Sequence, residues 1–165
     1  DFTFGINMNF QYKNWDMSMF WNGSVGNDIF DYTALYYETP YFFNGNRSTR
    51  VLDSWSPSNT DAALPALSET ITNNEFTLAN SFFVRDGTYV RLRTLQIGYT
   101  LPDTIASKLG ASSARIYYNG SNLLTLTDFP GLDPEVPRGG ALDIGVYSQQ
   151  YPTNALSSIG ININF

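Results

Sequence analysis

A strict two-residue alternation of apolar and polar side chains is the feature that most constrains how this chain folds. It is clearest at the end of the chain, where residues 157–165 read SSIGININF. In an extended strand, successive side chains point to opposite faces, so one face here is apolar and the other is small and polar. Chain ends usually fray and carry polar residues, so we expect this end to be held in a sheet. The apolar face consists of Ile159, Ile161, Ile163 and Phe165.

The same alternation opens the chain and returns in its middle. Residues 2–12 alternate aromatic, Ile and Met side chains with Thr, Gly, Asn and Gln, over a length close to the ~9–11 residues of a tilted membrane-spanning strand. Strands of soluble proteins usually have about five or six residues. The pattern predicts an all-β chain with five antiparallel strands, at about 1–12, 15–25, 82–101, 114–126 and 152–165.

The connections between these strands alternate between short and long. Lys13-Asn14 predicts a two-residue turn, in which Asn tolerates a positive φ, and DTIASKLG at 103–110 predicts a short helical turn closed by its final glycine. The long connections lie at about 26–81 and 127–151. In an up-and-down transmembrane barrel, short turns face the periplasm and long loops face outward. We therefore expect both long loops on the outer side.

The composition favours a membrane barrel over a soluble β-sandwich, which would show the same alternation in any single strand. Charged residues make up 15% of the chain, against roughly 25% in soluble domains. The polar strand faces carry Asn, Gln, Ser, Thr and Gly, whereas a soluble sandwich normally exposes charges there. Uncharged polar groups suit a hydrated lumen. The residues expected to face it are Asn7, Asn9, Gln11, Gln96, Asn162 and Asn164.

Several kinds of chemistry are excluded by residue content. The net charge of −6 argues against a nucleic-acid partner, because no basic stripe is present to neutralise phosphates. Without Cys or His, this chain cannot form a structural zinc site or a Ser-His-Asp triad. Asp133-Pro134-Glu135, with Asp128 and Asp143, could hold a calcium ion, but the spacing is not that of an EF-hand loop and a plain acidic loop is favoured. We predict no catalytic residues, no metal site, no cofactor and no enzymatic activity.

Two arginines interrupt the apolar face of the third predicted strand. Counting back from Leu101 in steps of two places Arg93 and Arg91 on the same face as the apolar residues of this strand. An Arg facing lipid costs about 2–4 kcal/mol at the centre of the bilayer but only about 0–1 kcal/mol near its boundary. We therefore expect both side chains near the outer boundary, either paired with anionic lipid headgroups or in a solvated rim.

Aromatic residues in the first long loop are the best candidates for ligand contact. Exposed Tyr and Trp stack on sugar rings or hold peptides at low conformational cost. The alternative is that these residues pack the loop against itself or against a neighbouring subunit. The same loop contains DAALPALSET at 61–70, which predicts a helical turn. The candidate contact residues are Tyr36, Tyr37, Tyr41, Phe42, Phe43 and Trp55.

Four stretches, in this order along the chain, carry a family resemblance: GNRSTRVLDSWSPSNTD at 45–61, YVRLRTLQIGYTLP at 89–102, RIYYNGSNLLTLTDFPGLDPEV at 115–136 and the terminal IGININF. They resemble the C-terminal end of SusC/RagA-family TonB-dependent outer-membrane transporters. Two stretches depart from the family pattern: Asn122-Leu123-Leu124 lacks an aromatic residue, and LDIGVYSQQYP lacks the usual Asp-Tyr-Gly-Thr-Tyr-Pro.

The resemblance implies that the chain is a fragment holding the last five strands of a barrel of about 22 strands. Five strands alone cannot close a barrel. The plug domain and the segment that contacts TonB would lie upstream, outside this chain. The terminal aromatic strand would be read by the outer-membrane assembly machinery and would close the barrel by pairing with its first strand.

The function expected from this resemblance is active import of oligosaccharides or peptides across the bacterial outer membrane. The implied partners are the rest of the barrel and its plug, a SusD-like surface lipoprotein, the TonB complex and outer-membrane lipids. Two alternatives remain open. A passive porin-like channel would have similar strands but no plug, and a soluble carbohydrate-binding β-sandwich would stay in solution without detergent.

Overall fold

The computed structural model describes residues 1–39, 45–67, 79–136 and 144–165. The chain divides into two compact units. The first unit comprises Asp1–Asn27, Gly87–Phe129 and Pro152–Phe165, and the second comprises Asp28–Asp86 and Pro130–Tyr151. No helix among the described residues is long and apolar enough to cross a membrane.

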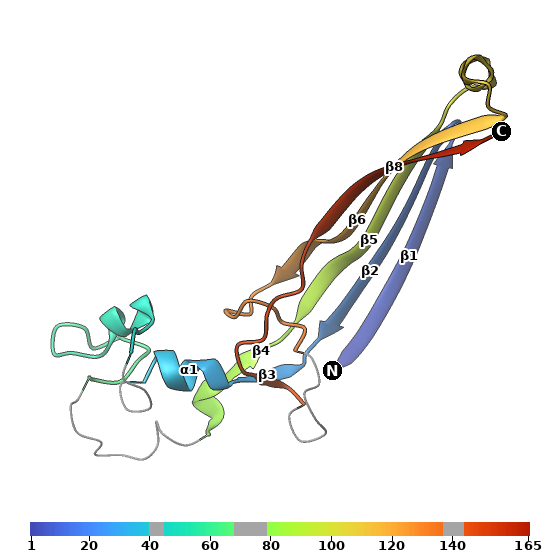
Figure 1. The fold of residues 1–165 in the computed structure, drawn as a ribbon. Helices are drawn as coiled ribbons and strands as arrows, with labels where there is room; N and C mark the ends of the chain where they lie inside the picture. Colours follow the sequence, from blue (N-terminus) through green and yellow to red (C-terminus); the bar gives the residue numbers. More distant parts are fainter. Residues whose placement is uncertain (40–44, 68–78, 137–143) are drawn as a thin grey trace. The chain divides into compact units, whose positions relative to one another are not determined.

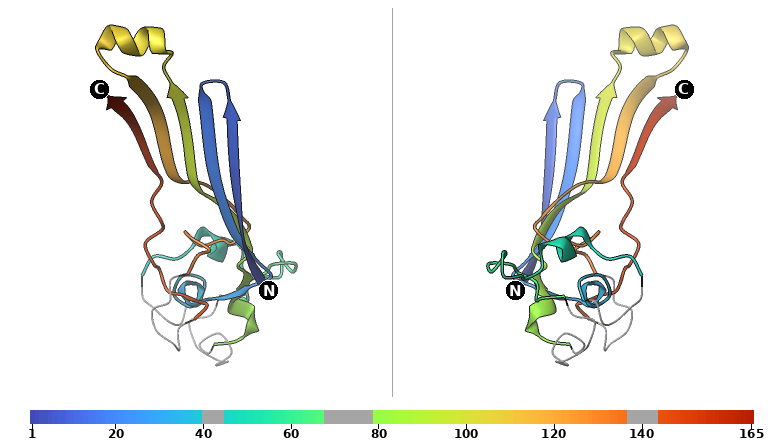
Figure 2. Two further views of the ribbon diagram at one scale, coloured as in Figure 1. Left: turned by 90° about the vertical axis from the view of Figure 1, so that its right-hand side faces the viewer. Right: turned by 90° about the vertical axis from the view of Figure 1, so that its left-hand side faces the viewer.

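The first unit is a five-stranded antiparallel sheet in which each strand pairs with the next along the chain (Figures 1 and 2). This confirms the predicted five-stranded antiparallel sheet. Membership of a larger closed barrel stays a prediction. The strands, in sheet order, are β1 (Phe2–Tyr12), β2 (Trp15–Val25), β5 (Tyr89–Thr100), β6 (Ser113–Thr127) and β8 (Leu156–Asn164).

Some predicted boundaries were wrong. The third strand was expected from residue 82, but Ser81–Phe83 is a 3-10 helix (η3) and Val84–Asp86 (β4) belongs to another sheet. The last strand was expected from residue 152 but begins at Leu156. The described part of the predicted helical turn at 61–70 contains no helix. Leu64 instead bridges to Ser54 in an extended conformation, just before a proline that cannot donate a backbone hydrogen bond.

The two short connections have the predicted form. The first joins Tyr12 to Trp15, which face each other across the hairpin. Its positive φ of 53° falls on Lys13, whereas we assigned that tolerance to Asn14. Asn14 instead binds the neighbouring strand, because its side-chain amide donates to the Thr100 carbonyl at 2.8 Å. The second connection contains helix α2 (Asp103–Ala106) and the 3-10 helix η4 (Ser107–Leu109), closed by a left-handed glycine.

A β-bulge at Arg93 changes the alternation of β5. Thr94 pairs with Phe20 of β2, and the next paired residue, Leu92, pairs with Trp21, so Arg93 is an extra residue. A one-residue insertion exchanges the two faces of a strand beyond it. Arg91 therefore lies opposite Asn22, on the polar face. The prediction that Arg91 shares the apolar face was wrong, because counting back from Leu101 cannot reveal a bulge.

The second unit contains a small sheet in the order β4-β3-β7, formed by β3 (Asp28–Asp31), β4 and β7 (Val146–Tyr147). The β3 and β7 strands are parallel, and they come from the two different long connections. Helix α1 (Tyr32–Tyr37) follows β3 directly, and the 3-10 helix η1 (Thr49–Asp53) comes later in the same connection. The predicted outer loops thus contain a small folded unit with its own core. That core consists of Ala34, Leu35 and Phe83, flanked by Phe30, Tyr32, Tyr36 and Phe82.

Candidate functional site

Helix α1 begins at a buried carboxylate. The Asp31 side chain accepts a hydrogen bond from the Ala34 backbone N–H at 3.2 Å, which caps the first turn of the helix. Asp31 is only 7% exposed. This burial raises the pKa of Asp31, while the Ala34 hydrogen bond and the Arg85 charge act in the opposite direction. The cap fixes where α1 starts and therefore which side chains it presents.

One face of α1 is buried and another carries polar and aromatic side chains. Ala34 and Leu35 pack into the core of the second unit. Tyr32 and Tyr36 are four residues apart, so they lie on the same side of the helix. Their rings meet edge to face with centroids 5.2 Å apart, and their hydroxyls are 3.0 Å apart. The Tyr36 hydroxyl donates to the Tyr32 hydroxyl, and this hydrogen bond raises the pKa of Tyr36.

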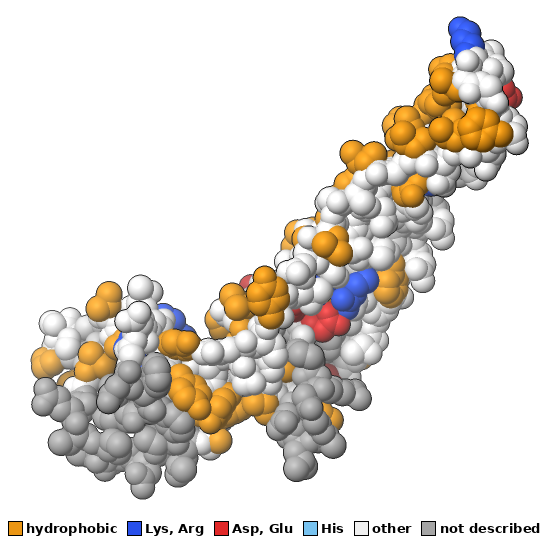
Figure 3. Space-filling view, viewed as in Figure 1, with side chains coloured by type: hydrophobic (Ala, Val, Ile, Leu, Met, Phe, Trp, Pro, Cys, Tyr) orange, Lys and Arg blue, Asp and Glu red, His pale blue; other side chains and the backbone are white. Residues whose placement is uncertain are grey.

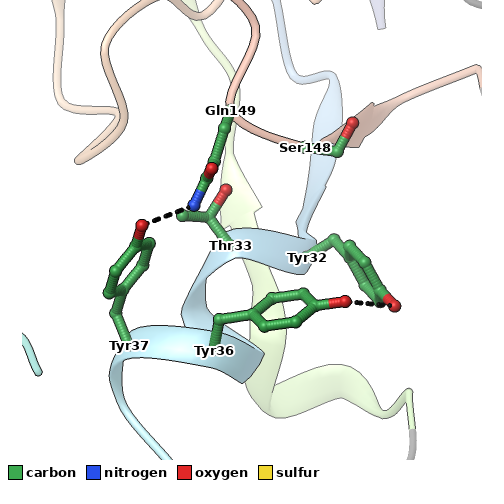
Figure 4. Close-up of a pocket in the computed structure, with 6 residues that line it drawn as sticks. All are labelled: Tyr32, Thr33, Tyr36, Tyr37, Ser148 and Gln149. Atoms are coloured by element: carbon green, nitrogen blue, oxygen red, sulfur yellow. Dashed lines mark hydrogen bonds between the residues drawn. The ribbon is translucent and has the colours of Figure 1, made fainter. Parts of the chain in front are cut away.

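The segment after β7 completes the site from the other long connection. Gln149 has a φ of 61°, an uncommon conformation for a residue with a side chain. Its amide donates to the Tyr37 hydroxyl at 2.8 Å (Figure 4). Tyr147 lies just before it, is 3% exposed, and accepts a hydrogen bond from the Leu132 backbone N–H at 3.0 Å. Gln149 is thus attached to a buried part of the second unit.

These elements enclose a pocket of about 340 Å³. In Figure 4, the tyrosines rise from α1 on one side and Gln149 reaches toward Tyr37 from the other. Among the described residues, the pocket lining includes no charged side chain. The pocket can therefore offer aromatic rings, hydroxyls and an amide to a ligand. We call it the tyrosine pocket; its lining residues are Tyr32, Thr33, Tyr36, Tyr37, Ser148 and Gln149.

Charged groups of the second unit gather around Glu38, just after α1. The Glu38 side chain is 9% exposed and pairs with Arg50 and with Arg85, the latter at 3.4 Å. Arg47 donates to the Tyr36 carbonyl, and the Ser48 N–H donates to the Tyr37 carbonyl at 3.0 Å. These contacts hold the segment after residue 44 against the end of α1. No group of three or more potential metal ligands occurs in the described parts of the chain.

The structure brings together only some of the predicted contact residues. Tyr36 and Tyr37 both line the tyrosine pocket. Trp55 is not among the residues that line this pocket. It follows η1, is 43% exposed, and its backbone N–H donates to the Leu64 carbonyl. Tyr41, Phe42 and Phe43 lie outside the described residues.

Four lining residues were missed by the sequence analysis: Tyr32, Thr33, Ser148 and Gln149. The four-residue spacings within YTALYY are a signal for the first two, because they place Tyr32 with Tyr36 and Thr33 with Tyr37. No sequence signal indicates the others, since Gln149 is 112 residues from its partner Tyr37.

The residues predicted to face a lumen share one face of the large sheet. Asn9 and Gln96 both pair with Ser18, and Asn162 pairs with Arg115. The same registers place the remaining predicted residues, Asn7, Gln11 and Asn164, opposite Phe20, Asp16 and Ser113. That this face lines a lumen stays a prediction.

The apolar residues of β8 lie on the opposite face. Ile159 and Ile161 pair with Tyr118 and Ile116 of β6, and Ile163 pairs with Ala114. Phe165 follows the strand and is 90% exposed. On its other side, β8 has no partner strand among the described residues. A barrel-closing role for this strand stays a prediction.

Comparison with known proteins gives a consistent result. No protein-family model matches the chain. TonB-dependent receptor P3 of Formosa agariphila is 36% identical over 171 residues, and receptor P26 of the same organism is 32% identical over 173 residues. TonB-dependent receptor SusC of Bacteroides thetaiotaomicron is 25% identical over 170 residues. Each match covers the whole of this chain but only 15–17% of the relative.

Solved structures share the fold. The RagAB peptide transporter matches 98% of this chain and 17% of the solved chain, with a TM-score of 0.77 and 24% identity. The RagAB peptide importer in its closed-closed state matches 99% of this chain with a TM-score of 0.78. These relatives are receptors and transporters, which confirms the prediction that the chain is not an enzyme. The predicted resemblance is also confirmed: over its whole length this chain is similar to a segment of TonB-dependent receptors, SusC among them, and it shares the fold of the RagAB transporter.

Proposed function

We propose that this chain is the C-terminal barrel segment of an outer-membrane importer that takes up oligosaccharides or peptides with a SusD-like surface lipoprotein and energy from the TonB complex. The observation that carries the proposal is a two-faced sheet that is similar throughout to TonB-dependent receptors. The full-length protein would perform the import. This chain would contribute part of the barrel wall, part of the polar lining of the lumen, and outer loops.

The apolar face of the sheet supports a position in the membrane. Figure 3 shows hydrophobic side chains exposed along the sheet with few charged ones among them. Large exposed apolar surfaces are rare on soluble monomers, and the outside of a transmembrane barrel needs them. The rings of Trp15 and Tyr99 are in contact, tilted by 48° with centroids 4.7 Å apart, near the short connections, where an interfacial aromatic girdle would lie. Exposed apolar residues of the two edge strands include Ile6, Phe10, Tyr12, Ile159 and Ile161.

The connectivity supports an outward position for the second unit. Both segments of that unit connect strands at the ends opposite the two short turns. In transmembrane barrels, short turns are periplasmic and long connections are extracellular. The second unit would then meet ligand and lipoprotein first. Plug movement elsewhere in the full-length protein would release the ligand inward.

The test uses the full-length protein in its native bacterium. An 18.5-kDa segment that spans 16% of a relative implies a full-length protein of roughly 100 kDa or more. We expect this species in the outer-membrane fraction, extracted only by detergent. We also expect that deleting its gene abolishes uptake of its ligand, and that removing TonB abolishes uptake without abolishing binding.

Each alternative gives a different result in the same experiment. A passive channel would continue to take up ligand without TonB. A soluble binding module would be recovered as a small species in buffer without detergent. Either result would contradict the proposed importer.

A further inference from the structure

We propose that the tyrosine pocket binds an uncharged, hydroxyl-rich ligand, namely a sugar residue of a neutral glycan. This inference rests on the proposed importer function and narrows its ligand from oligosaccharides or peptides to neutral oligosaccharides. It also assigns the contact to residues from both long connections. The first evidence is the chemistry of the lining.

The described lining carries the same kinds of hydrogen-bonding groups as a sugar. Tyr, Thr and Ser hydroxyls and the Gln amide each offer a donor and an acceptor, as sugar hydroxyls do. Charged ligands lose hydration on entering a pocket and need an opposite charge to compensate for it. Peptides bring charged termini and side chains, and acidic glycans bring carboxylates or sulfates. The six described lining residues carry no charge, and the nearby charges of Glu38, Arg50 and Arg85 are paired with one another.

The polar groups are positioned before a ligand arrives. The Tyr37 hydroxyl accepts a hydrogen bond from the Gln149 amide, which leaves the hydroxyl hydrogen to donate and the amide oxygen to accept. The Tyr36 ring is held edge to face against Tyr32 and by the hydroxyl contact at 3.0 Å. Side chains that are fixed in advance lose less conformational entropy on binding.

The backbone of Gln149 is a second, independent indication of function. A φ of 61° favours glycine, yet this position holds a long polar side chain that reaches the pocket. Residues in such sparsely populated conformations persist only where the surroundings fix them, and they gather at ligand sites. Here the buried Tyr147 and the Tyr37 hydrogen bond provide that support.

The size of the pocket fits one unit of a chain. Small-molecule sites span about 300–1,000 Å³, and this pocket of about 340 Å³ lies at the lower end. It therefore suits a single sugar residue, with the rest of the oligosaccharide continuing outside. Aromatic rings lining it can stack on the apolar face of that sugar.

The test uses the full-length protein purified in detergent and an array that carries neutral oligosaccharides, uronic-acid and sulfated oligosaccharides, and peptides. We expect wild-type binding to neutral oligosaccharides. Tyr36→Ala should weaken it about tenfold or more by removing a ring, and Tyr37→Phe and Gln149→Ala should weaken it about three- to tenfold by removing one polar contact. Tyr151→Phe, at a tyrosine that is 84% exposed and outside the lining, is the matched control and should bind as wild type does.

The outcomes separate this inference from the proposed function. Wild-type binding only to peptides or acidic glycans, binding to nothing on the array, or unchanged neutral-glycan binding in all three pocket variants would overturn the inference. TonB-dependent uptake by the wild-type strain would leave the importer function standing in each of those cases. Because Tyr37→Phe retains the ring, equal thermal stability of this variant and the wild type shows that lost binding is not lost folding.

Discussion

Arg115 on β6 reaches across β5 to Asp16 on β2, with its Nε 3.0 Å from a carboxylate oxygen and its terminal nitrogen 2.5 Å from the other. The guanidinium also lies 5.3 Å from the centre of the Tyr117 ring. Both nitrogens cross over Gly98, where an added Cβ would clash with the Arg115 side chain. One ion pair therefore connects β6 to β2 across β5 on the polar face, and it depends on a glycine in the strand between them.

Gly98→Ala should displace Arg115 and break its contact with Asp16. Overpacking of this kind typically costs about 1–3 kcal/mol, so we expect a lower unfolding temperature for the full-length protein in detergent. The temperature at which heated samples change mobility in SDS gels measures it. The same substitution in an Arg115→Ala background is the control and should cost much less, because nothing then crosses residue 98. Equal losses in the two backgrounds would disprove the dependence on Gly98.

Glu38→Gln should loosen the segment that follows α1. The carboxylate of Glu38 pairs with both Arg50 and Arg85, and removing its charge should destabilise this segment by about 1–3 kcal/mol. Because trypsin cuts after arginine, we expect faster tryptic cleavage in the region of Arg47 and Arg50, measured by mass spectrometry on the folded full-length protein. Asp61→Asn, an exposed carboxylate in the same connection, is the control and should leave the rate unchanged. Identical cleavage rates in both variants would contradict a holding role for Glu38.

The large sheet could be predicted because its information is local. Alternation with a period of two places neighbouring side chains on opposite faces, and the two short connections pair β1 with β2 and β5 with β6 without knowledge of distant residues. The bulge could not be predicted in this way, since Arg93 looks like an ordinary member of the pattern. Its position is determined by the next residue, Thr94, which pairs with Phe20 on one side and with Ser121 on the other.

Only the part of the tyrosine pocket that α1 provides could be predicted from the sequence. YTALYY has a helical spacing that a close reading of the sequence can detect. The other half depends on β7 pairing in parallel with β3, which brings together residues more than a hundred positions apart. Such a contact leaves no mark in local periodicity. For the same reason, Trp55 was grouped with Tyr36 and Tyr37 as an aromatic residue, although the structure does not place it in the pocket.

The bulge predicts an unusual labelling pattern along β5. Val90 and Leu95 should face the same apolar side, while Gln96 faces the polar side. Without the bulge, Val90 would share the side of Gln96. We would place single cysteines at these three positions of the full-length protein and attach a spin label to each. Lipid-dissolved oxygen should relax the labels at 90 and 95, and a water-soluble nickel complex should relax the label at 96. Matching behaviour of 90 and 96 would show that the strand keeps a simple alternation.

Asp31 should make the stability of α1 depend on pH. Burial raises its pKa in the folded state, so the protonated form favours folding. The stabilisation from protonated Asp31 is fully present below its ordinary pKa of 3.8 and is lost as the pH rises through its raised pKa in the folded protein. Hydrogen exchange of the peptide covering 32–37 in the full-length protein, corrected for the intrinsic rate at each pH, should show protection falling over that interval.

Asp31→Asn separates the charge from the cap. Asn accepts the same hydrogen bond from the Ala34 N–H but does not ionise, so protection of α1 should become independent of pH. Asp31→Ala loses the cap and should reduce protection at every pH, by about 1 kcal/mol. If wild type and Asp31→Asn instead lose protection in parallel as the pH rises, the pH dependence belongs to another group. If Asp31→Ala exchanges as slowly as Asp31→Asn, the cap does not stabilise α1, and packing of Ala34 and Leu35 alone must hold it.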